Sequence, residues 1–321
     1  MKKLMAIGEA LIDMIGSEQG YEVKDAKSFI PKVGGAPANV CGAFVKLGGA
    51  ASLITMLGED AFGDKIYEYL CSVGIDCSHV LRTPQANTSL AFVSRDKSGN
   101  RSFSFYRNPG ADMLLGAGDI REEWFADCYC LHFCSVSLGD FPMKEAHKKA
   151  IEYARRAGAI ISFDPNLRLN LWDSPEKLRR AVKEFLPLCD ILKISDEELE
   201  FITGKKDICD AADDLLKGNV KLLVYTKGNA GAMAFNAAGS ASSLAVEANV
   251  VDTTGAGDAF IGSFLFSLCS DHVRAEELSK LDSRRLLRYL NFSNGYCAKS
   301  VGREGAIDSY PTAAEMGLRG Q

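Results

Sequence analysis

Short apolar segments alternate with amphipathic ones along much of this chain, and this alternation constrains the fold more than any other feature of the sequence. Helical patterns lie at 143–157 and at 174–189, where Ser174 can cap the helix and Pro175 suits its first position. Because strands that alternate with helices form parallel sheets, the pattern predicts an α/β fold with a mainly parallel sheet and helices on both faces. The apolar segments predict strands at 3–8, 51–57, 128–134, 159–164, 190–194 and 220–226.

Two stretches, 12–33 and 88–107, have strand character without helices between their strands. The second predicts a hairpin that turns at Lys97–Asn100. Both suit a small sheet outside the main one, which is either a lid or an edge extension, and the pattern leaves these alternatives open. Because no repeat or long linker divides the chain, we expect a single domain over 1–321.

Composition excludes some classes of function. The chain has 37 Lys and Arg against 42 Asp and Glu, and this net charge of −5 gives no support for binding nucleic acid or a membrane surface. Glu9 and Asp13 interrupt the apolar stretch at the start, which therefore predicts a first strand rather than a signal peptide. The ten cysteines then indicate free thiols in a reducing compartment, so we expect a cytoplasmic protein without a transmembrane helix.

One cysteine cluster resembles a set of metal ligands: Cys128, Cys130, His132 and Cys134. On a strand these residues share one face but spread along it, with the outer two roughly 20 Å apart at ~3.3 Å per residue. Four ligands at that spacing cannot converge on one ion, so the segment predicts a buried strand.

The strongest local signal is the sequence VVDTTGAGDAF at 250–260. Glycines where a strand runs into a helix let backbone N–H groups face an anion, and the helix N-terminus adds partial positive charge. Asp258, in the first helical turn, either stabilises the helix dipole or accepts a proton from a substrate hydroxyl beside bound phosphate. The run lacks the Lys-Ser/Thr pair of a P-loop and the third glycine of a dinucleotide fingerprint.

Three further segments place polar residues where strands end. Gly34 and Gly35 precede a helix with Asn39 in its first turn, which indicates either a tight turn or an edge that binds a polyol together with Asp13. Asp164, Asn166 and Arg168 follow a buried strand, at the edge where open α/β sheets bind ligands; a surface loop is the alternative. Ser195 and Glu198 have the spacing of a capping box, and Glu198 could also hold Mg²⁺ through water.

Together these motifs resemble the ribokinase-like (PfkB) family of carbohydrate kinases over nearly the whole chain. Residues 34–60 resemble one family signature and 252–260 the other. The resemblance implies a Rossmann-like domain with a β-sheet lid, here at about 12–33 and 88–110. It also implies transfer of the γ-phosphoryl group of ATP to a sugar hydroxyl with Mg²⁺ present.

The resemblance also implies roles for individual residues. Asp258 matches the catalytic base, and Arg168 the arginine that assists transfer. The anion hole corresponds to Gly255, Ala256 and Gly257, and the sugar contacts to Asp13, Gly34, Gly35 and Asn39, with Arg107 in the lid hairpin beside them. The nucleotide side corresponds to Asn166, Thr226, Lys227, Gly228, Gly231 and Asn294, and Asp252 and Thr254 match positions that hold a monovalent cation, such as K⁺, in some relatives.

The family's usual Asn-x-x-Glu motif here reads Ser195-x-x-Glu198, a form typical of fructokinases, as are the segments 107–115 and 164–172. We therefore expect phosphorylation of the primary hydroxyl of fructose. A 2-keto-3-deoxygluconate kinase, or another ribokinase-like sugar kinase, is the alternative. A Rossmann oxidoreductase and a non-catalytic sugar-binding protein fit the motifs less well. An exposed lid sheet would also permit a homodimer.

Overall fold

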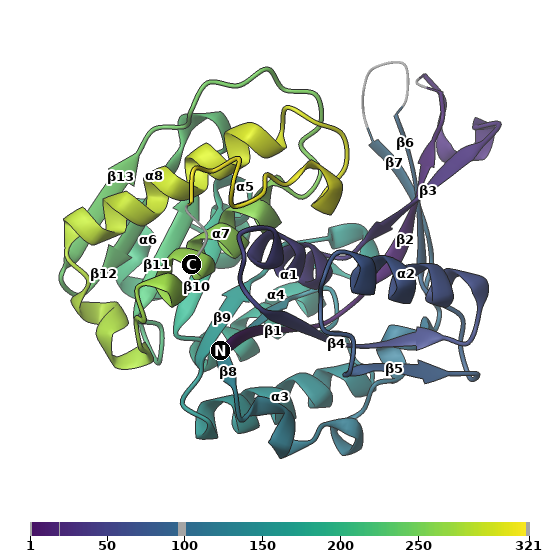
Figure 1. The fold of residues 1–321 in the computed structure, drawn as a ribbon, viewed down its shortest axis with the longest axis horizontal. Helices are drawn as coiled ribbons and strands as arrows, with labels where there is room; N and C mark the ends of the chain where they lie inside the picture. Colours follow the sequence, from purple (N-terminus) through teal and green to yellow (C-terminus); the bar gives the residue numbers. More distant parts are fainter. Residues whose placement is uncertain (1, 19, 96–100, 319–321) are drawn as a thin grey trace.

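The computed structural model describes residues 2–18, 20–95 and 101–318. Within these ranges the main element is a sheet of nine strands whose only antiparallel pairs are β11–β12 and β12–β13 (Figure 1). Its order is β13 (Gly239–Ser243), β12 (Ala232–Asn236), β11 (Leu222–Thr226), β10 (Ile191–Ser195), β9 (Ile160–Asp164), β8 (Cys128–Cys134), β1 (Lys3–Ile7), β4 (Ala51–Gly58) and β5 (Val80–Thr83).

Helices cover both faces of this sheet, and alternate residues of each strand feed two separate cores. On β1, Leu4 and Ala6 belong to one core and Met5 and Ile7 to the other, as the two-residue period of a strand requires. One core packs under α1 (Ala36–Lys46), α2 (Ala61–Ser72), α7 (Ala256–Ser270) and α8 (Ser283–Ser300), the other under α3 (Pro142–Arg156), α4 (Pro175–Phe185), α5 (Asp196–Thr203) and α6 (Ile208–Leu215). The predicted α/β fold is confirmed.

The six predicted strands are present with small changes at their ends. The helix predicted at 174–189 ends at Phe185 and continues as a short 3₁₀ turn, Leu186–Leu188, because Pro187 has no N–H for the helical ladder. The segment with the four candidate metal ligands is the buried strand β8.

A second sheet stands off the main body at the upper right of Figure 1. Its order is β3 (Phe29–Gly34), β2 (Leu11–Gly16), β6 (Leu90–Arg95) and β7 (Arg101–Tyr106). The hairpin turn predicted at 97–100 lies outside the described residues. Ile15 pairs with Ile30 and with Val93, and Val93 with Phe103, so these four form one row across the sheet. Asp13 lies two residues before Ile15 and therefore on the same face.

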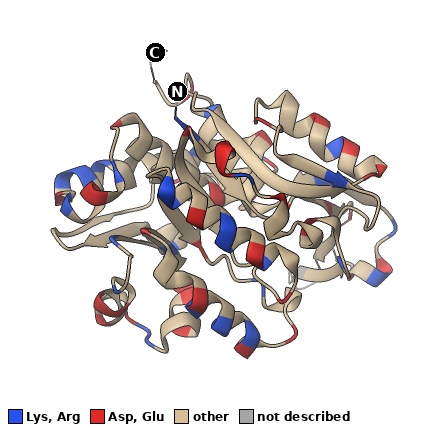
Figure 2. Cartoon of the chain, turned by 90° about the horizontal axis from the view of Figure 1, so that it is seen from below, with Lys and Arg blue, Asp and Glu red and all other residues tan. Residues whose placement is uncertain are grey.

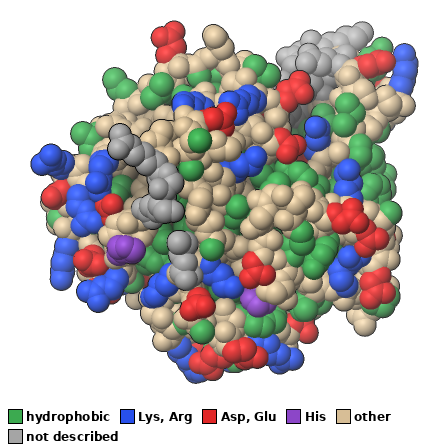
Figure 3. Space-filling view, in the orientation of Figure 1, with side chains coloured by type: hydrophobic (Ala, Val, Ile, Leu, Met, Phe, Trp, Pro, Cys, Tyr) green, Lys and Arg blue, Asp and Glu red, His purple; other side chains and the backbone are tan. Residues whose placement is uncertain are grey.

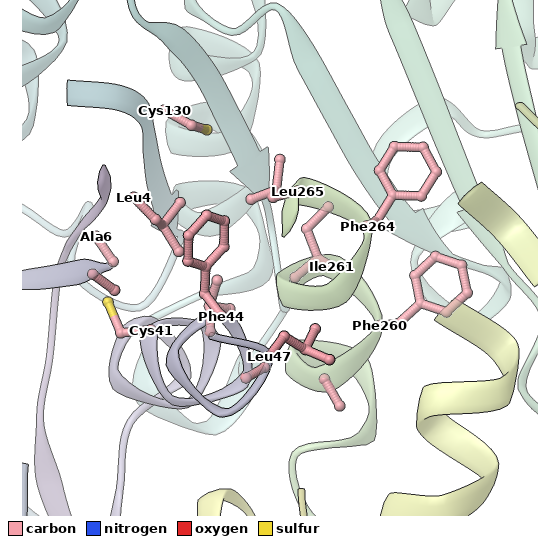
Figure 4. Packing of buried hydrophobic residues seen from close by; sticks show 14 of the residues in the cluster. Leu4, Ala6, Cys41, Phe44, Leu47, Cys130, Phe260, Ile261, Phe264 and Leu265 are labelled. Carbon is pink, nitrogen blue, oxygen red and sulfur yellow. The ribbon is translucent and has the colours of Figure 1, made fainter. Parts of the chain in front are cut away.

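Helices α1 and α7 pack closely against each other over the sheet. Figure 4 shows Phe44 of α1 and Leu47, directly after that helix, beside Ile261 and Leu265 of α7. A Cβ atom at Gly262 would lie 2.7 Å from the Cβ of Ala43, so only a glycine permits this approach. The contact aligns the first turns of the two helices.

In Figure 2, positions occupied by Lys or Arg and by Asp or Glu are interspersed along the helices. This mixture agrees with the balanced composition of the sequence. Among the described residues, no helix combines the length and the hydropathy that crossing a membrane would need.

Candidate active site

Asp258 lies in the first turn of α7 and is buried, with only 7% of its surface exposed. Its Oδ2 accepts a 2.9 Å hydrogen bond from Nδ2 of Asn39, which lies in the first turn of α1. Burial raises the pKa of Asp258 to about 6, although the hydrogen bond from Asn39 lowers it. From the helix N-terminus alone we expect a firmly ionised, weak base. Desolvation instead makes this carboxylate a stronger base that is still mostly ionised at pH 7.

The turn before Asp258 is built for glycine. Gly255 has a φ of +72°, and a Cβ there would lie 2.5 Å from the hydroxyl of Tyr310, which donates to the Gly255 carbonyl. The N–H of Ala256 donates to Thr253, whereas the N–H groups of Gly257 and Asp258 have no acceptor among the described residues. Two N–H groups at a helix N-terminus can bind an anion.

The predicted sugar contacts meet at the root of the small sheet. A Cβ at Gly34 would lie 2.1 Å from Oδ2 of Asp13, so glycine lets that carboxylate cross the chain. Gly35, with a φ of +115°, precedes α1 and packs on the carbonyl of Glu9. Asn39 is buried, and its Oδ1 has no hydrogen-bond partner in the described chain. Because an orphaned buried acceptor is costly, this atom suits a ligand hydroxyl.

Behind Asp258, one buried lysine lies among two further acidic residues, Asp164 and Glu198. Nζ of Lys193 on β10 lies 2.7 Å from Oδ2 of Asp164 at the end of β9, and both side chains are almost fully buried. Glu198 accepts the N–H of Leu167 on Oε1 and that of Ser195 on Oε2. Burial raises the pKa of Glu198, and the negative charge of Asp164 adds to that shift. The capping interpretation of Glu198 therefore describes one of its two oxygens, since the other holds the loop after β9.

That loop carries Asn166 and Arg168. Asn166 has a φ of +45°, and its N–H donates to Oδ1 of Asp164. Arg168 is exposed and donates from Nη1 to the carbonyl of Leu167, and its positive charge lowers the pKa of Asp258. Both predicted residues thus lie at the sheet edge with Asp258.

The predicted nucleotide-side residues divide into two groups. Thr226 ends β11, and Lys227 and exposed Gly228 form the turn after it. Gly231 closes this turn with a φ of +93°. Asn294 is different, because it is buried on α8 and its Nδ2 donates to Ser243 and to the carbonyl of Leu244. Its amide nitrogen is therefore engaged in fixing the chain after β13.

Arg107 lies in a buried ion pair. Its guanidinium donates to both carboxylate oxygens of Asp112, and the two side chains are 5% and 1% exposed. Ser89 also donates to Asp112, and the positive charge of Arg107 acts on buried Glu9. The structure thus places Arg107 at the root of the small sheet, with its charge compensated.

The predicted monovalent-cation residues link two loops. Oδ1 of Asp252 accepts the N–H and the hydroxyl of Thr254, and Oδ2 accepts the N–H of Gly305. Beside them a cleft of about 440 Å³ opens between β3, α2 and residues 305–308.

Lys193 is the residue that the motifs missed. A lysine between Leu192 and Ile194, in a strand otherwise apolar, was an available signal, because such a residue needs a buried partner. The exposed apolar residues Leu244, Val246, Val250 and Val251, between β13 and the glycine turn, were also missed.

Comparison with known proteins agrees with this arrangement. The model of the pfkB family carbohydrate kinases matches residues 1–313. Fructokinase-2 of Solanum lycopersicum is 38% identical over 313 residues, which cover 97% of this chain and 94% of the relative. The crystal structure of fructokinase with bound ATP from Xylella fastidiosa has a TM-score of 0.88 at 33% identity, covering 98% of this chain and 96% of that one. Fructokinase from Vibrio cholerae O395 with fructose, ADP and calcium ion has a TM-score of 0.85 at 31% identity, covering 98% of each chain.

A glycine turn at a helix N-terminus with a buried carboxylate beside it, at the edge of such a sheet, defines a kinase of small hydroxylated molecules. The chain belongs to the pfkB family of carbohydrate kinases. The family and the ribokinase-like fold expected from the sequence are confirmed.

Proposed function

We propose that this protein transfers the γ-phosphoryl group of ATP to the primary hydroxyl of D-fructose, with Asp258 as the base. The observation that carries the proposal is the pairing of Asp258 with Asn39 beside two unengaged N–H groups. The hydroxyl proton passes to Asp258 while the hydroxyl oxygen bonds to the γ-phosphorus. In the same in-line step the bond from that phosphorus to the bridging oxygen breaks, and ADP leaves with the electron pair of that bond.

The sugar is held by groups at the root of the small sheet. Asn39 fixes Asp258 through Nδ2 and offers Oδ1 to a sugar hydroxyl. Asp13 accepts further hydroxyls, while Gly34 and Gly35 bring the backbone close to the ring. We propose that the small sheet serves as a lid over this site, because Asp13 and the apolar row of Ile15 share one face.

Charge on the transferred group is met by the N–H groups of Gly257 and Asp258, with the N-terminal dipole of α7 behind them. Arg168 adds a planar cation from the neighbouring loop. We assign the turn from Thr226 to Gly231 to the phosphates of ATP. The exposed apolar segment Leu244–Val251 and the chain fixed by Asn294 take the adenine.

The charges fit Mg²⁺. Asp164, Glu198 and Asp258 together outweigh Lys193, and both oxygens of Glu198 already accept N–H groups, so this carboxylate would hold the ion through water. When bound, Mg²⁺ neutralises the phosphate charge. In Glu198→Gln we expect a higher Mg²⁺ concentration at half-maximal rate. If only the melting temperature changes, Glu198 has a purely structural role.

The state of Arg107 favours fructose over 2-keto-3-deoxygluconate. An acid sugar carries a carboxylate that needs a cationic partner, whereas Arg107 is already bound to Asp112. The negative charge of Asp13 repels a carboxylate, whereas its oxygens can accept hydrogen bonds from neutral hydroxyls.

We further propose that K⁺ binds at Asp252 and Thr254. Replacing K⁺ by a large organic cation should slow the enzyme.

We also propose a homodimer formed through the row Ile15, Ile30, Val93 and Phe103. Hydrophobic atoms at the surface of the small sheet are visible at the upper right of Figure 3. Ile30→Glu would place a charge in this interface and should convert the dimer into a monomer, which light scattering would detect. The free thiols of the described cysteines fit a cytoplasmic location.

The deciding experiment measures ADP release, coupled to a second enzyme, with fructose, 2-keto-3-deoxygluconate, ribose and glucose at saturating ATP. We expect the highest kcat/KM with fructose. A value for the acid sugar about tenfold above that for fructose, ~1.4 kcal/mol in transition-state binding, would overturn the assignment.

A further inference from the structure

Lys193 is an unusual residue for the interior of a buried parallel strand. Strand β10 is buried, its other interior residues are apolar, and Lys193 itself is 5% exposed. Burying an ammonium group costs several kcal/mol unless it is paired and hydrogen-bonded. The ion pair with Asp164 explains how the protein tolerates Lys193, but not why a charge is present in the core.

The position of the ammonium indicates its use. A Cβ built on Gly257 would lie 3.3 Å from Nζ of Lys193, so the ammonium sits directly against the turn that precedes Asp258. Gly257 does not have the positive φ of Gly255. A side chain at 257 would instead crowd the charge of Lys193.

We propose that Lys193 is a positioning residue of phosphoryl transfer: its buried ammonium holds the turn at Gly257 against the ends of β9 and β10 and supplies the fixed positive charge that faces Asp258. The proposal rests on the proposed function of Asp258, and it adds a residue to the machinery on the side of the turn away from solvent.

The groups around Asp258 come from several elements. Asn39 of α1, Arg168 of the loop after β9 and Lys193 of β10 lower the pKa of Asp258, while Asp164 of β9 raises it. The charge of Asp258 also acts on Cys297 of α8 and on Tyr310. Burial raises the pKa of both groups, so both remain neutral near pH 7. Negative charge from Asp164, Glu198 and Asp258 raises the pKa of Lys193 above its ordinary value despite burial, so the lysine stays charged.

Two substitutions must therefore act in opposite directions. Lys193→Met removes a positive charge, which makes ionisation of Asp258 harder and moves the acid limb of the kcat/KM profile to higher pH. Asp164→Asn removes a negative charge and moves the same limb to lower pH. A general loss of packing would not move this limb in opposite directions in the two variants.

The chain offers a matched control at the opposite end of the same sheet. Lys221, just before β11, lies 2.9 Å from Asp190, just before β10, and joins neighbouring strands as Lys193 and Asp164 do. Lys221→Met should lower the melting temperature and leave the pH profile unchanged.

The test combines kinetics with a direct titration. For the wild type, Lys193→Met, Lys193→Arg, Asp164→Asn and Lys221→Met, kcat/KM is measured from pH 5 to 9. The Asp258 carboxyl is followed by ¹³C NMR of Asp-labelled protein, with its signal assigned from Asp258→Asn. We expect an upward shift in Lys193→Met, a downward shift in Asp164→Asn and a near wild-type profile in Lys193→Arg.

Superimposable Asp258 titrations in wild type and Lys193→Met would overturn the proposal. The titration needs no turnover, so it tests Lys193 even if fructose is not the substrate. Failure of the proposed function would instead show as an inactive wild type in the sugar panel.

Discussion

Asn39 and Asp258 are 219 residues apart in the sequence, yet their side chains share a 2.9 Å hydrogen bond in the interior. Each lies one helical turn before a residue of the close contact between α1 and α7, Asn39 before Ala43 and Asp258 before Gly262. The packing of two helices against the sheet thus sets the geometry of the candidate base.

Replacing Asp258 by Asn should keep the fold and ATP binding, because the amide has the same shape. Turnover should fall by ~10²–10⁴-fold, because the amide cannot take the hydroxyl proton. Steady-state kinetics and calorimetric ATP binding are the measurements. Near wild-type turnover would remove Asp258 from the role of base.

The rate of the wild type should fall as the pH drops through about 6, because burial raises the pKa of Asp258 to about 6 and only the ionised form accepts a proton. Asn39→Leu removes a hydrogen bond that lowers this pKa, so its acid limb should lie at higher pH than that of the wild type. A profile for Asn39→Leu with an unshifted limb would contradict the coupling.

Arg168→Lys keeps the charge but loses the planar fork, so kcat/KM should drop clearly with little change in melting temperature. Arg180→Lys, an exposed change on α4, is the control and should change neither quantity. Equal activity of Arg168→Lys and the wild type would make the loop after β9 a surface loop without a catalytic part.

Asp112→Asn should weaken the buried pair with Arg107 and release its positive charge. We expect a loss of stability of about 3 kcal/mol and a shift of the kcat/KM ratio toward 2-keto-3-deoxygluconate. Denaturant unfolding and the sugar panel measure the two effects, with exposed Asp140→Asn as the control. An unchanged ratio would show that Arg107 has no influence on substrate choice.

Glu9 should make stability depend on pH. Burial raises its pKa from 4.5 to about 7, so the folded state holds a proton that the unfolded chain releases. Its contribution therefore becomes less favourable as the pH rises from about 4.5 to 7, by up to about 3 kcal/mol. Glu9→Gln should gain stability over the wild type at pH 8 but not at pH 4. An equal difference in unfolding free energy between Glu9→Gln and the wild type at the two pH values would disprove this.

The sequence was sufficient for the parts of the fold set by local pattern. Strands such as Leu222–Thr226 lie in largely apolar runs, and the helix after Ser174 has its capping serine, its proline at the first position and its apolar stripe. Strands β12 and β13 were not predicted. For β13 the reason is that the small residues of Gly239–Ser243 carry no clear alternation. The parallel pairing of β2 with β6 joins distant segments and is decided by tertiary packing.

For the site, glycine patterns located the turn at Gly255 and the edge at Gly34, because backbone conformation and close approach there exclude side chains. The partners of individual side chains were not predictable. Arg107 pairs with Asp112, five residues further along the chain, and Lys193 reaches Gly257 from another element. Both contacts depend on how the chain folds, which local sequence patterns do not specify.

The small sheet is formed by two separate excursions of the chain away from the main body. One gives β2 and β3, the other β6 and β7, and between them the chain builds α1, β4, α2 and β5 of the main body. No single pair of cuts removes this sheet. Grafting it onto a relative would need junctions at both ends of each excursion, and those of the first would lie close to Asp13 and Gly34. Exchanging one continuous segment therefore cannot transfer the small sheet without also transferring α1, β4, α2 and β5 of the main body.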